Sequence, residues 1–226
     1  MQIALLGSAP SSYRLAPFGD PTWEIWACSP QNYTAPRVDA WFELHNLERK
    51  WVPGNEVYVS TIKNHARVYV AQTDSRLPNG IVYPKDEVYE FFGNYQYLDT
   101  FFQSQVSFML ALAIMQAPKT IGLWGIDMAA ADEYGQQRPG CHYFFHEAQK
   151  RGIEIIAPPQ SDILEPLPLY AYKEFIPKYW RIKARILELK QAVQECDAKI
   201  QQLDHEKLLK TGALQDIEYH KNTYMR

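Results

Sequence analysis

The sequence predicts an α/β protein in which a mostly parallel sheet carries helices on both faces and a C-terminal coiled-coil helix follows. The apolar runs Ile3–Leu6 and Thr120–Trp124 each end at a glycine, Gly7 and Gly125, and a loop follows. Buried parallel strands end in this way, and open α/β sheets bind ligands at the carboxyl ends of their strands. An apolar heptad pattern after residue 180 predicts the coiled coil.

Short apolar runs alternate with helical or turn segments from residue 1 to about residue 165, as in a Rossmann-like domain with right-handed crossovers. Helices are expected over residues 100–117, which are apolar nearly all round, and 142–151, which Gly152 ends. The expected strands are Ile3–Leu6, Trp23–Cys28, Ala40–Leu44, Val57–Ser60, Arg67–Val70, Thr120–Trp124 and Glu154–Ile156. Residues 1–165 are therefore expected to form a nucleotide- or nucleotide-sugar-binding domain.

Residues 166–226 are expected to form a separate helical tail. Its apolar residues recur at alternating spacings of 4 and 3, and they are Ile182, Ile186, Leu189, Val193, Cys196, Ile200 and Leu203. The pattern stops near Thr211-Gly212, and a short helix is expected from Ala213. This seam predicts a homo-oligomer through residues 178–210, and a parallel pairing would allow Cys196 of two copies to cross-link. A helix that lies along its own domain is the alternative.

Composition excludes several classes of protein. The 226 residues carry a formal net charge of −3, which gives no support for nucleic-acid binding. The 3 cysteines lie far apart with no metal-ligand spacing, so a reduced, cytoplasmic location and no bound metal are expected. The N-terminus lacks the basic region of a signal peptide, and no apolar stretch approaches the ~20 residues of a membrane span.

The loops at the expected carboxyl edge contain groups suited to a nucleotide. Gly7 allows a tight turn, and the hydroxyls of Ser8, Ser11 and Ser12, with backbone N–H groups at a helix start, could hold phosphate oxygens. The loop is neither a GxGxxG motif nor a P-loop, and a simple helix cap is the alternative. After the second strand, Asn32 offers an amide suited to a base or sugar, or belongs to an ordinary polar turn.

The third expected strand contains Glu43, and His45 and Asn46 fall at its end, so they are expected to face the same crevice. An isolated histidine is more often structural than catalytic.

A second group of candidates follows Asp127. Residues 128–139 have the composition of a mobile lid, in which Tyr134 and Arg138 could contact a phosphate. His142 is expected at the start of the next helix, where an imidazole with a near-neutral pKa could serve as a general base. His146 lies four residues on, but a third metal ligand is lacking.

Several short motifs follow one another along residues 1–165, and they are Gly7-Ser-Ala-Pro-Ser11, Asn32, the Ser104–Met115 helix, Lys119-Thr-Ile121, Gly125-Ile-Asp127, Cys141-His142 and Ser161-Asp-Ile-Leu164. In this order they resemble the motifs of the bacterial sialyltransferases of glycosyltransferase family 42 and the related DUF115 group. Two departures are evident: Ala9 replaces a glycine of the first motif, and the lid is much shorter, with Tyr134 as its one tyrosine. No acceptor-binding region is recognisable.

The resemblance implies metal-independent, inverting transfer of a sugar from a nucleotide-activated donor, such as a CMP-sialic-acid-like compound, to a hydroxyl, with no further cofactor. The phosphate would lie on the Gly7–Ser12 loop, the base and ribose near Asn32, Ser104 and Asp127, and His142 would be the general base.

Two alternatives remain from the sequence. The short lid and the coiled-coil tail favour a catalytically inactive nucleotide-binding or scaffold protein. Some DUF115 members transfer pyrophosphate from ATP, which needs a divalent cation, and Asp127, Asp132 and Glu133 could hold one.

Overall fold

The computed structural model describes residues 1–28, 35–47, 56–128, 132–165 and 178–224, and of these all side chains except those of 132–134, 178–185 and 187–188. Asn32 therefore lies outside the described residues. The chain divides into two compact units, Met1–Glu165 and Pro166–Arg226, each described by itself. In the described part of the chain, no helix combines the length and the apolar character needed to cross a membrane.

Seven strands form one sheet in the order β5-β4-β3-β2-β1-β6-β7, and every pairing among the described residues is parallel. The predicted fold class is thus confirmed. The chain moves outward from β1 to β5 and then returns across the sheet to β6, so the strand order reverses between β1 and β6. The strands are β1 (Gln2–Leu6), β2 (Trp23–Cys28), β3 (Ala40–Glu43), β4 (Val68–Val70), β5 (Ile81–Val82), β6 (Thr120–Trp124) and β7 (Glu154–Ile156).

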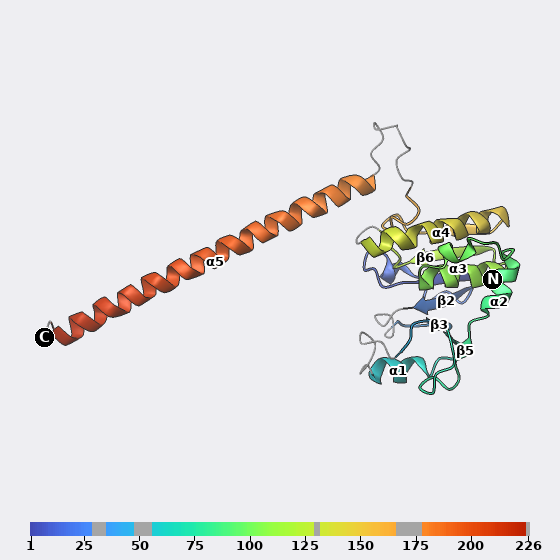
Figure 1. The fold of residues 1–226 in the computed structure, drawn as a ribbon, viewed down its shortest axis with the longest axis horizontal. Coiled ribbons are helices and arrows are strands. Elements are labelled where there is room, and N and C mark those ends of the chain that lie inside the picture. Colours follow the sequence, from blue (N-terminus) through green and yellow to red (C-terminus); the bar gives the residue numbers. More distant parts are fainter. Residues whose placement is uncertain (29–34, 48–55, 129–131, 166–177, 225–226) are drawn as a thin grey trace. The chain divides into compact units, whose positions relative to one another are not determined.

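Helices cover both faces of this sheet because successive residues of each strand point to opposite sides. Ile3 and Leu5 of β1 pack in one core with α2 (Lys85–Phe91), α3 (Gln105–Met115) and α4 (Asp132–Lys150). Ala4 and Leu6 pack in the other core, which contains buried residues of α1 (Glu56–Ile62). Figure 1 shows α3 and α4 together on one side of the sheet and α1 apart from them. The described part of this unit also contains two short 3-10 helices, η1 (Tyr13–Leu15) and η3 (Leu98–Phe101).

Several local predictions were wrong. Val57–Ser60 lies in α1 rather than in a strand, because Tyr58 and Ile62 bury one helical face, which outweighs the β-branched residues. The sequence prediction missed α2 and β5, and both residues of β5 are exposed.

The expected lid over 128–139 is largely helical, since α4 begins at Asp132 and contains Pro139. Acidic residues in the first turn of α4 favour a helix start. Pro139 has no backbone N–H and so costs the helix one hydrogen bond, but the burial of Cys141 and Phe144 in the core compensates for this loss.

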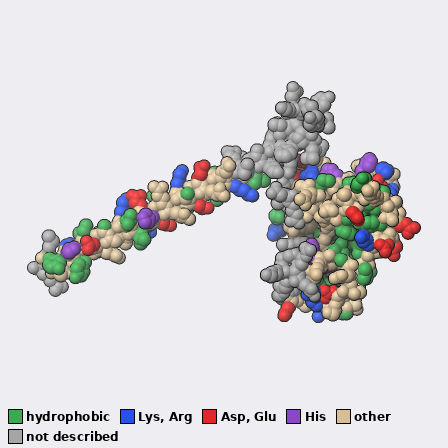
Figure 2. Space-filling model, viewed as in Figure 1, with side chains coloured by type: hydrophobic (Ala, Val, Ile, Leu, Met, Phe, Trp, Pro, Cys, Tyr) green, Lys and Arg blue, Asp and Glu red, His purple; other side chains and the backbone are tan. Residues whose placement is uncertain are grey.

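The second unit contains α5 (Lys178–Tyr224), which runs unbroken through the expected turn at Thr211-Gly212. A glycine within a helix costs only about 0.5–1 kcal/mol, which a helix of this length can absorb. Apolar side chains lie exposed along α5, as Figure 2 shows, including those of Leu189, Val193 and Leu203.

Candidate functional site

The loops after β1 and β6 lock together at the reversal of strand order. The Gly7 amide donates to the Trp124 carbonyl (2.8 Å), and the Ala9 amide donates to the Gly125 carbonyl (2.8 Å). The Gly125 amide donates to the Ser12 hydroxyl (2.9 Å). A Cβ atom at Gly7 would lie 2.3 Å from the Gly125 carbonyl oxygen, so only glycine allows this approach. The carboxyl edge of β1 and β6 is therefore built to a fixed shape.

These bonds alter the expected phosphate contacts. Ser12 is buried and its hydroxyl holds the Gly125 amide, so this serine positions the loop. Ser8 and Ser11 are exposed at the same edge. The helix that follows, η1, is a three-residue 3-10 helix, too short to offer the dipole expected of a helix start. Of the three serines that were expected to bind a phosphate, Ser8 and Ser11 are exposed and Ser12 is buried. The hydroxyls of Ser8 and Ser11 therefore remain the candidates for a phosphate contact.

Asp127 lies just beyond the carboxyl end of β6. Its carboxylate oxygen Oδ1 is buried and has no hydrogen-bond partner among the described residues. Asp162 follows β7, and its Oδ1 accepts a hydrogen bond from the Met128 amide (3.2 Å). Burial raises the pKa of Asp162, and the nearby charge of Asp127 raises it further. Two carboxylates thus lie near enough to influence each other, and Asp127 has an oxygen for which the described residues supply no hydrogen-bond donor.

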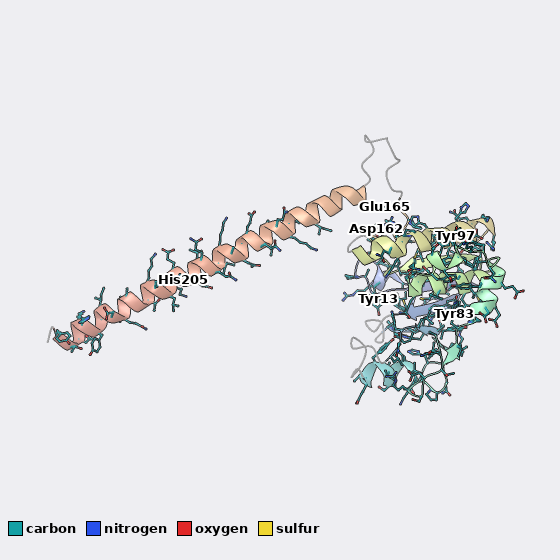
Figure 3. All side chains as sticks on the ribbon, in the orientation of Figure 1. Tyr13, Tyr83, Tyr97, Asp162, Glu165 and His205 are labelled. Atoms are coloured by element: carbon teal, nitrogen blue, oxygen red, sulfur yellow. The ribbon has the colours of Figure 1, made fainter. Side chains whose placement is uncertain are left out.

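Arg138 holds the segment after β7 in place. Its guanidinium lies 3.4 Å from Asp162 Oδ2 and donates to the carbonyls of Asp162 (2.8 Å) and Glu165 (2.9 Å). The side chain is 8% exposed. Figure 3 labels Asp162 and Glu165, which lie close together at this end of the domain. Because it is buried in these contacts, Arg138 stabilises the fold here and is not part of a mobile lid. Tyr134 lies in α4, and its side chain is outside the described residues.

His142 lies within α4, ten residues after its first residue rather than at its start. Its Nε2 lies 2.9 Å from the Ile163 carbonyl oxygen, so Nε2 carries a proton and Nδ1 is the acceptor of the neutral ring. Burial lowers the pKa of His142, and the charge of Arg138 lowers it further. His146 on the same helix is exposed. Within the described residues, no three His, Cys, Asp or Glu side chains gather as a metal site would require.

Ser104 and Cys141 meet between α3 and α4. The Ser104 hydroxyl caps α3 by accepting from the Ser107 amide (3.1 Å) and lies 4.0 Å from the Cys141 sulfur. Burial raises the pKa of the Cys141 thiol to about 11, so this thiol is no nucleophile at neutral pH. The Cys141 sulfur also lies 3.8 Å from the sulfur of Met128, the residue after Asp127, so Cys141 connects the start of α3 with the segment that follows β6.

Sequence reasoning missed the surroundings of His45. Its Nδ1 lies 2.8 Å from Oε1 of Glu43, which is fully buried at the end of β3, and the Tyr58 hydroxyl donates to the other carboxylate oxygen. Glu43 and His45 line a pocket of about 230 Å³ beside the carboxyl ends of β3 and β4. The available signal was a glutamate ending an otherwise apolar strand, two residues before a histidine.

No protein-family model matches the chain, and no curated protein matches it. Solved structures show remote similarity. Thiamine pyrophosphokinase from Bacillus subtilis has a TM-score of 0.43 at 15% identity, over 70% of this chain, which spans 60% of that protein's length. An α-2,3-sialyltransferase from Campylobacter jejuni has a TM-score of 0.46 at 16% identity, over 69% of this chain and 74% of its own. A C. jejuni sialyltransferase complexed with cytidine-5'-monophosphate has a TM-score of 0.38 at 15% identity, over 69% and 78%.

Proposed function

We propose that residues 1–165 bind a nucleotide-activated sugar at the reversal of strand order between β1 and β6 and transfer the sugar to a hydroxyl acceptor. The observation that carries this proposal is the buried Oδ1 of Asp127, which lacks a hydrogen-bond partner among the described residues. A buried carboxylate oxygen without a donor costs about 1–3 kcal/mol or more, and a ribose hydroxyl would remove that cost. Open parallel sheets bind nucleotides at this position, often through an acidic residue on the ribose.

The donor would lie along the edge with its nucleoside near Asp127 and its phosphate near the hydroxyls of Ser8 and Ser11. Ser12 and Gly7 keep the loop in shape. Ser104 caps α3, and its contact with the nucleoside stays a prediction. A CMP-linked donor follows from the sequence resemblance, and the contribution of Asn32 stays a prediction. The general-base role of His142 also stays a prediction, with Nδ1 as the nitrogen that would take the proton.

A thermal-shift screen tests the nucleotide proposal. CMP, UDP, GDP, ADP, ATP and their sugar conjugates are added with and without Mg²⁺. A ligand at about one hundred times its Kd stabilises the folded state by ~2.7 kcal/mol. Stabilisation by one cytidine or uridine compound, without Mg²⁺, is expected. Asp127→Asn should weaken it, while Asp86→Asn on the exposed start of α2 serves as the matched control. If none of these compounds stabilises the protein, the nucleotide proposal is wrong and a role as an assembly protein is favoured. Stabilisation by ATP only with Mg²⁺ supports pyrophosphate transfer.

We also propose that α5 pairs with α5 of a second copy. A helix in water depends mainly on packing of its apolar face, and the seam residues of α5 from Ile186 to Leu203 are exposed. Beyond Leu203 the same spacing reaches Lys207 and Lys210. A parallel pair would set each lysine against itself, whereas an antiparallel pair can set it against an apolar residue, so the antiparallel pair is favoured. Sedimentation as a monomer at micromolar concentration would exclude either pairing.

A further inference from the structure

Arg14 carries a positive charge that the fold does not use. Each of the other described arginines of the first unit forms an ion pair with a carboxylate. These pairs are Arg37 with Asp39, Arg67 with Glu24, Arg76 with Asp74, Arg138 with Asp162 and Arg151 with Glu147. Arg14 is exposed, and the described residues supply its side chain with neither a carboxylate nor another hydrogen-bond partner. Its guanidinium is therefore available to a ligand.

Arg14 shares a face with Ser11 on the helical turn that follows the loop after β1. The backbone amides of residues 13 and 15 donate to the carbonyls of residues 9 and 12 (3.2 and 2.9 Å), so the chain is helical over this stretch. Residues three apart lie on the same side of such a turn. Ser12 and Ala16 are buried, whereas Ser11 and Arg14 are exposed. One hydroxyl and one guanidinium therefore lie together on the solvent side of the turn.

This turn lies at the reversal of strand order. The helix η1 packs against β6, and the hydroxyl of Ser12, two residues before Arg14, accepts a hydrogen bond from the Gly125 amide (2.9 Å). Consecutive Cα atoms lie ~3.8 Å apart, so the Arg14 Cα lies within about 7.6 Å of the Ser12 Cα. An unpaired positive charge thus lies at the edge where the nucleotide is proposed to bind.

A guanidinium beside a hydroxyl suits a phosphate. A guanidinium can donate two parallel hydrogen bonds to phosphate oxygens, and it keeps its charge at neutral pH. The Ser11 hydroxyl lies 3.4 Å from the Ser12 hydroxyl, which is longer than an ordinary O–H···O bond, so it can turn toward a ligand. Because η1 is too short to offer a helix dipole, the positive charge of this turn comes from the Arg14 side chain.

We propose that Arg14 binds the phosphate of the donor and stabilises the charge that this phosphate gains when the sugar leaves. This inference rests on the proposed function. The bond between the anomeric carbon and the phosphate oxygen breaks, and its electron pair stays on that oxygen, which gains one negative charge. The acceptor oxygen bonds to the anomeric carbon, and the acceptor proton passes to the general base. A cation beside the phosphate favours the transition state, in which that charge develops, over the bound donor.

Two glutamine variants of the full chain test the assignment. Arg14→Gln and Lys119→Gln each remove one exposed positive charge, but Lys119 precedes β6 and so lies at the opposite edge of the sheet. Calorimetric titration compares CMP, or the nucleotide selected by thermal shift, with its nucleoside, which lacks the group that Arg14 binds. Arg14→Gln should raise the Kd of the nucleotide about tenfold and leave that of the nucleoside unchanged. Lys119→Gln should change neither.

Two further readouts separate the charge of Arg14 from its geometry and binding from catalysis. Arg14→Lys keeps the charge but not the paired hydrogen bonds, so its nucleotide Kd should lie between those of wild type and Arg14→Gln. Release of nucleotide from saturating donor gives kcat, which should fall about tenfold or more in Arg14→Gln. An unchanged nucleotide Kd in Arg14→Gln, an equal rise in Lys119→Gln, or an unchanged kcat overturns the proposal.

A measurement without nucleotide separates this inference from the proposed function. The backbone amide resonances of residues 11–15 are followed by NMR while inorganic pyrophosphate is added. We expect saturable shifts in wild type and in Lys119→Gln that are lost in Arg14→Gln. No shift at high millimolar pyrophosphate, or the same shifts in Arg14→Gln, overturns the proposal whether or not a nucleotide binds elsewhere. Saturable shifts through Arg14 in a chain that binds no nucleotide would contradict the proposed function alone.

Discussion

The contact between the loops after β1 and β6 gives a sharp prediction about stability. Gly125 has a φ of +64°, and a Cβ atom there would lie 2.5 Å from the Gly7 carbonyl oxygen. The left-handed backbone costs a residue with a side chain about 1–2 kcal/mol, and separating two packed segments costs about 1–3 kcal/mol more. Gly125→Ala should therefore lower the free energy of unfolding by about 2–5 kcal/mol, which corresponds to a fall in Tm of about 10 °C.

Calorimetry and urea denaturation followed by tryptophan fluorescence measure this change. Gly152 is the matched control, because its φ is +73° and nothing lies within 4 Å of a Cβ atom there. Gly152→Ala should show the conformational cost alone, about 1–2 kcal/mol. Gly135 in α4 also has nothing within 4 Å, so Gly135→Ala should cost nothing. Equal losses for Gly125→Ala and Gly152→Ala would refute the argument that the loops touch backbone to backbone.

Ser12→Ala leaves a buried amide without its acceptor and should lower the free energy of unfolding by about 1–3 kcal/mol, whereas exposed Ser11→Ala should not; urea titration compares them. Because the pKa of His142 lies below its ordinary 6.5 in the folded state, its contribution to stability is present above that pH and lost as the pH falls. Denaturation curves from about pH 7 to about pH 5 should therefore decline less for His142→Gln than for wild type, and equal declines would contradict the shift. In a Cys196→Ser background, Ile186→Cys lies near one end of the seam, so an antiparallel α5 pair should give no disulfide on a non-reducing gel after mild oxidation, and a cross-linked dimer would establish the parallel pair.

The arrangement of the sheet could be predicted because its central strands are uniformly apolar. Ile121 and Leu123 of β6 pack in one core and Trp124 in the other, which is the pattern of a strand buried on both faces. Asp127 could be placed at the edge because it follows β6 so closely. The strand β5 could not be predicted, since its two residues are exposed and too few to show an alternation of apolar and polar residues.

The parts of the site that sequence reasoning missed depend on pairs far apart in the chain. Arg138 finds Asp162 only when α4 packs beside the segment after β7. Glu43 finds the Tyr58 hydroxyl only because α1 covers the face of β3. Spacing within the sequence does not encode such meetings. The contact of His45 with Glu43 is local, and the glutamate that ends the apolar strand was its signal in the sequence.

Binding of a nucleotide at the reversal of strand order is tested most directly by mapping where a nucleotide binds. Backbone amide resonances of the full chain are assigned and followed while CMP, or the nucleotide selected by thermal shift, is added. We expect the largest shifts in residues 7–12 and 125–128, and their loss in Asp127→Asn. Saturable shifts confined to another part of the domain, or none at millimolar nucleotide, would contradict it.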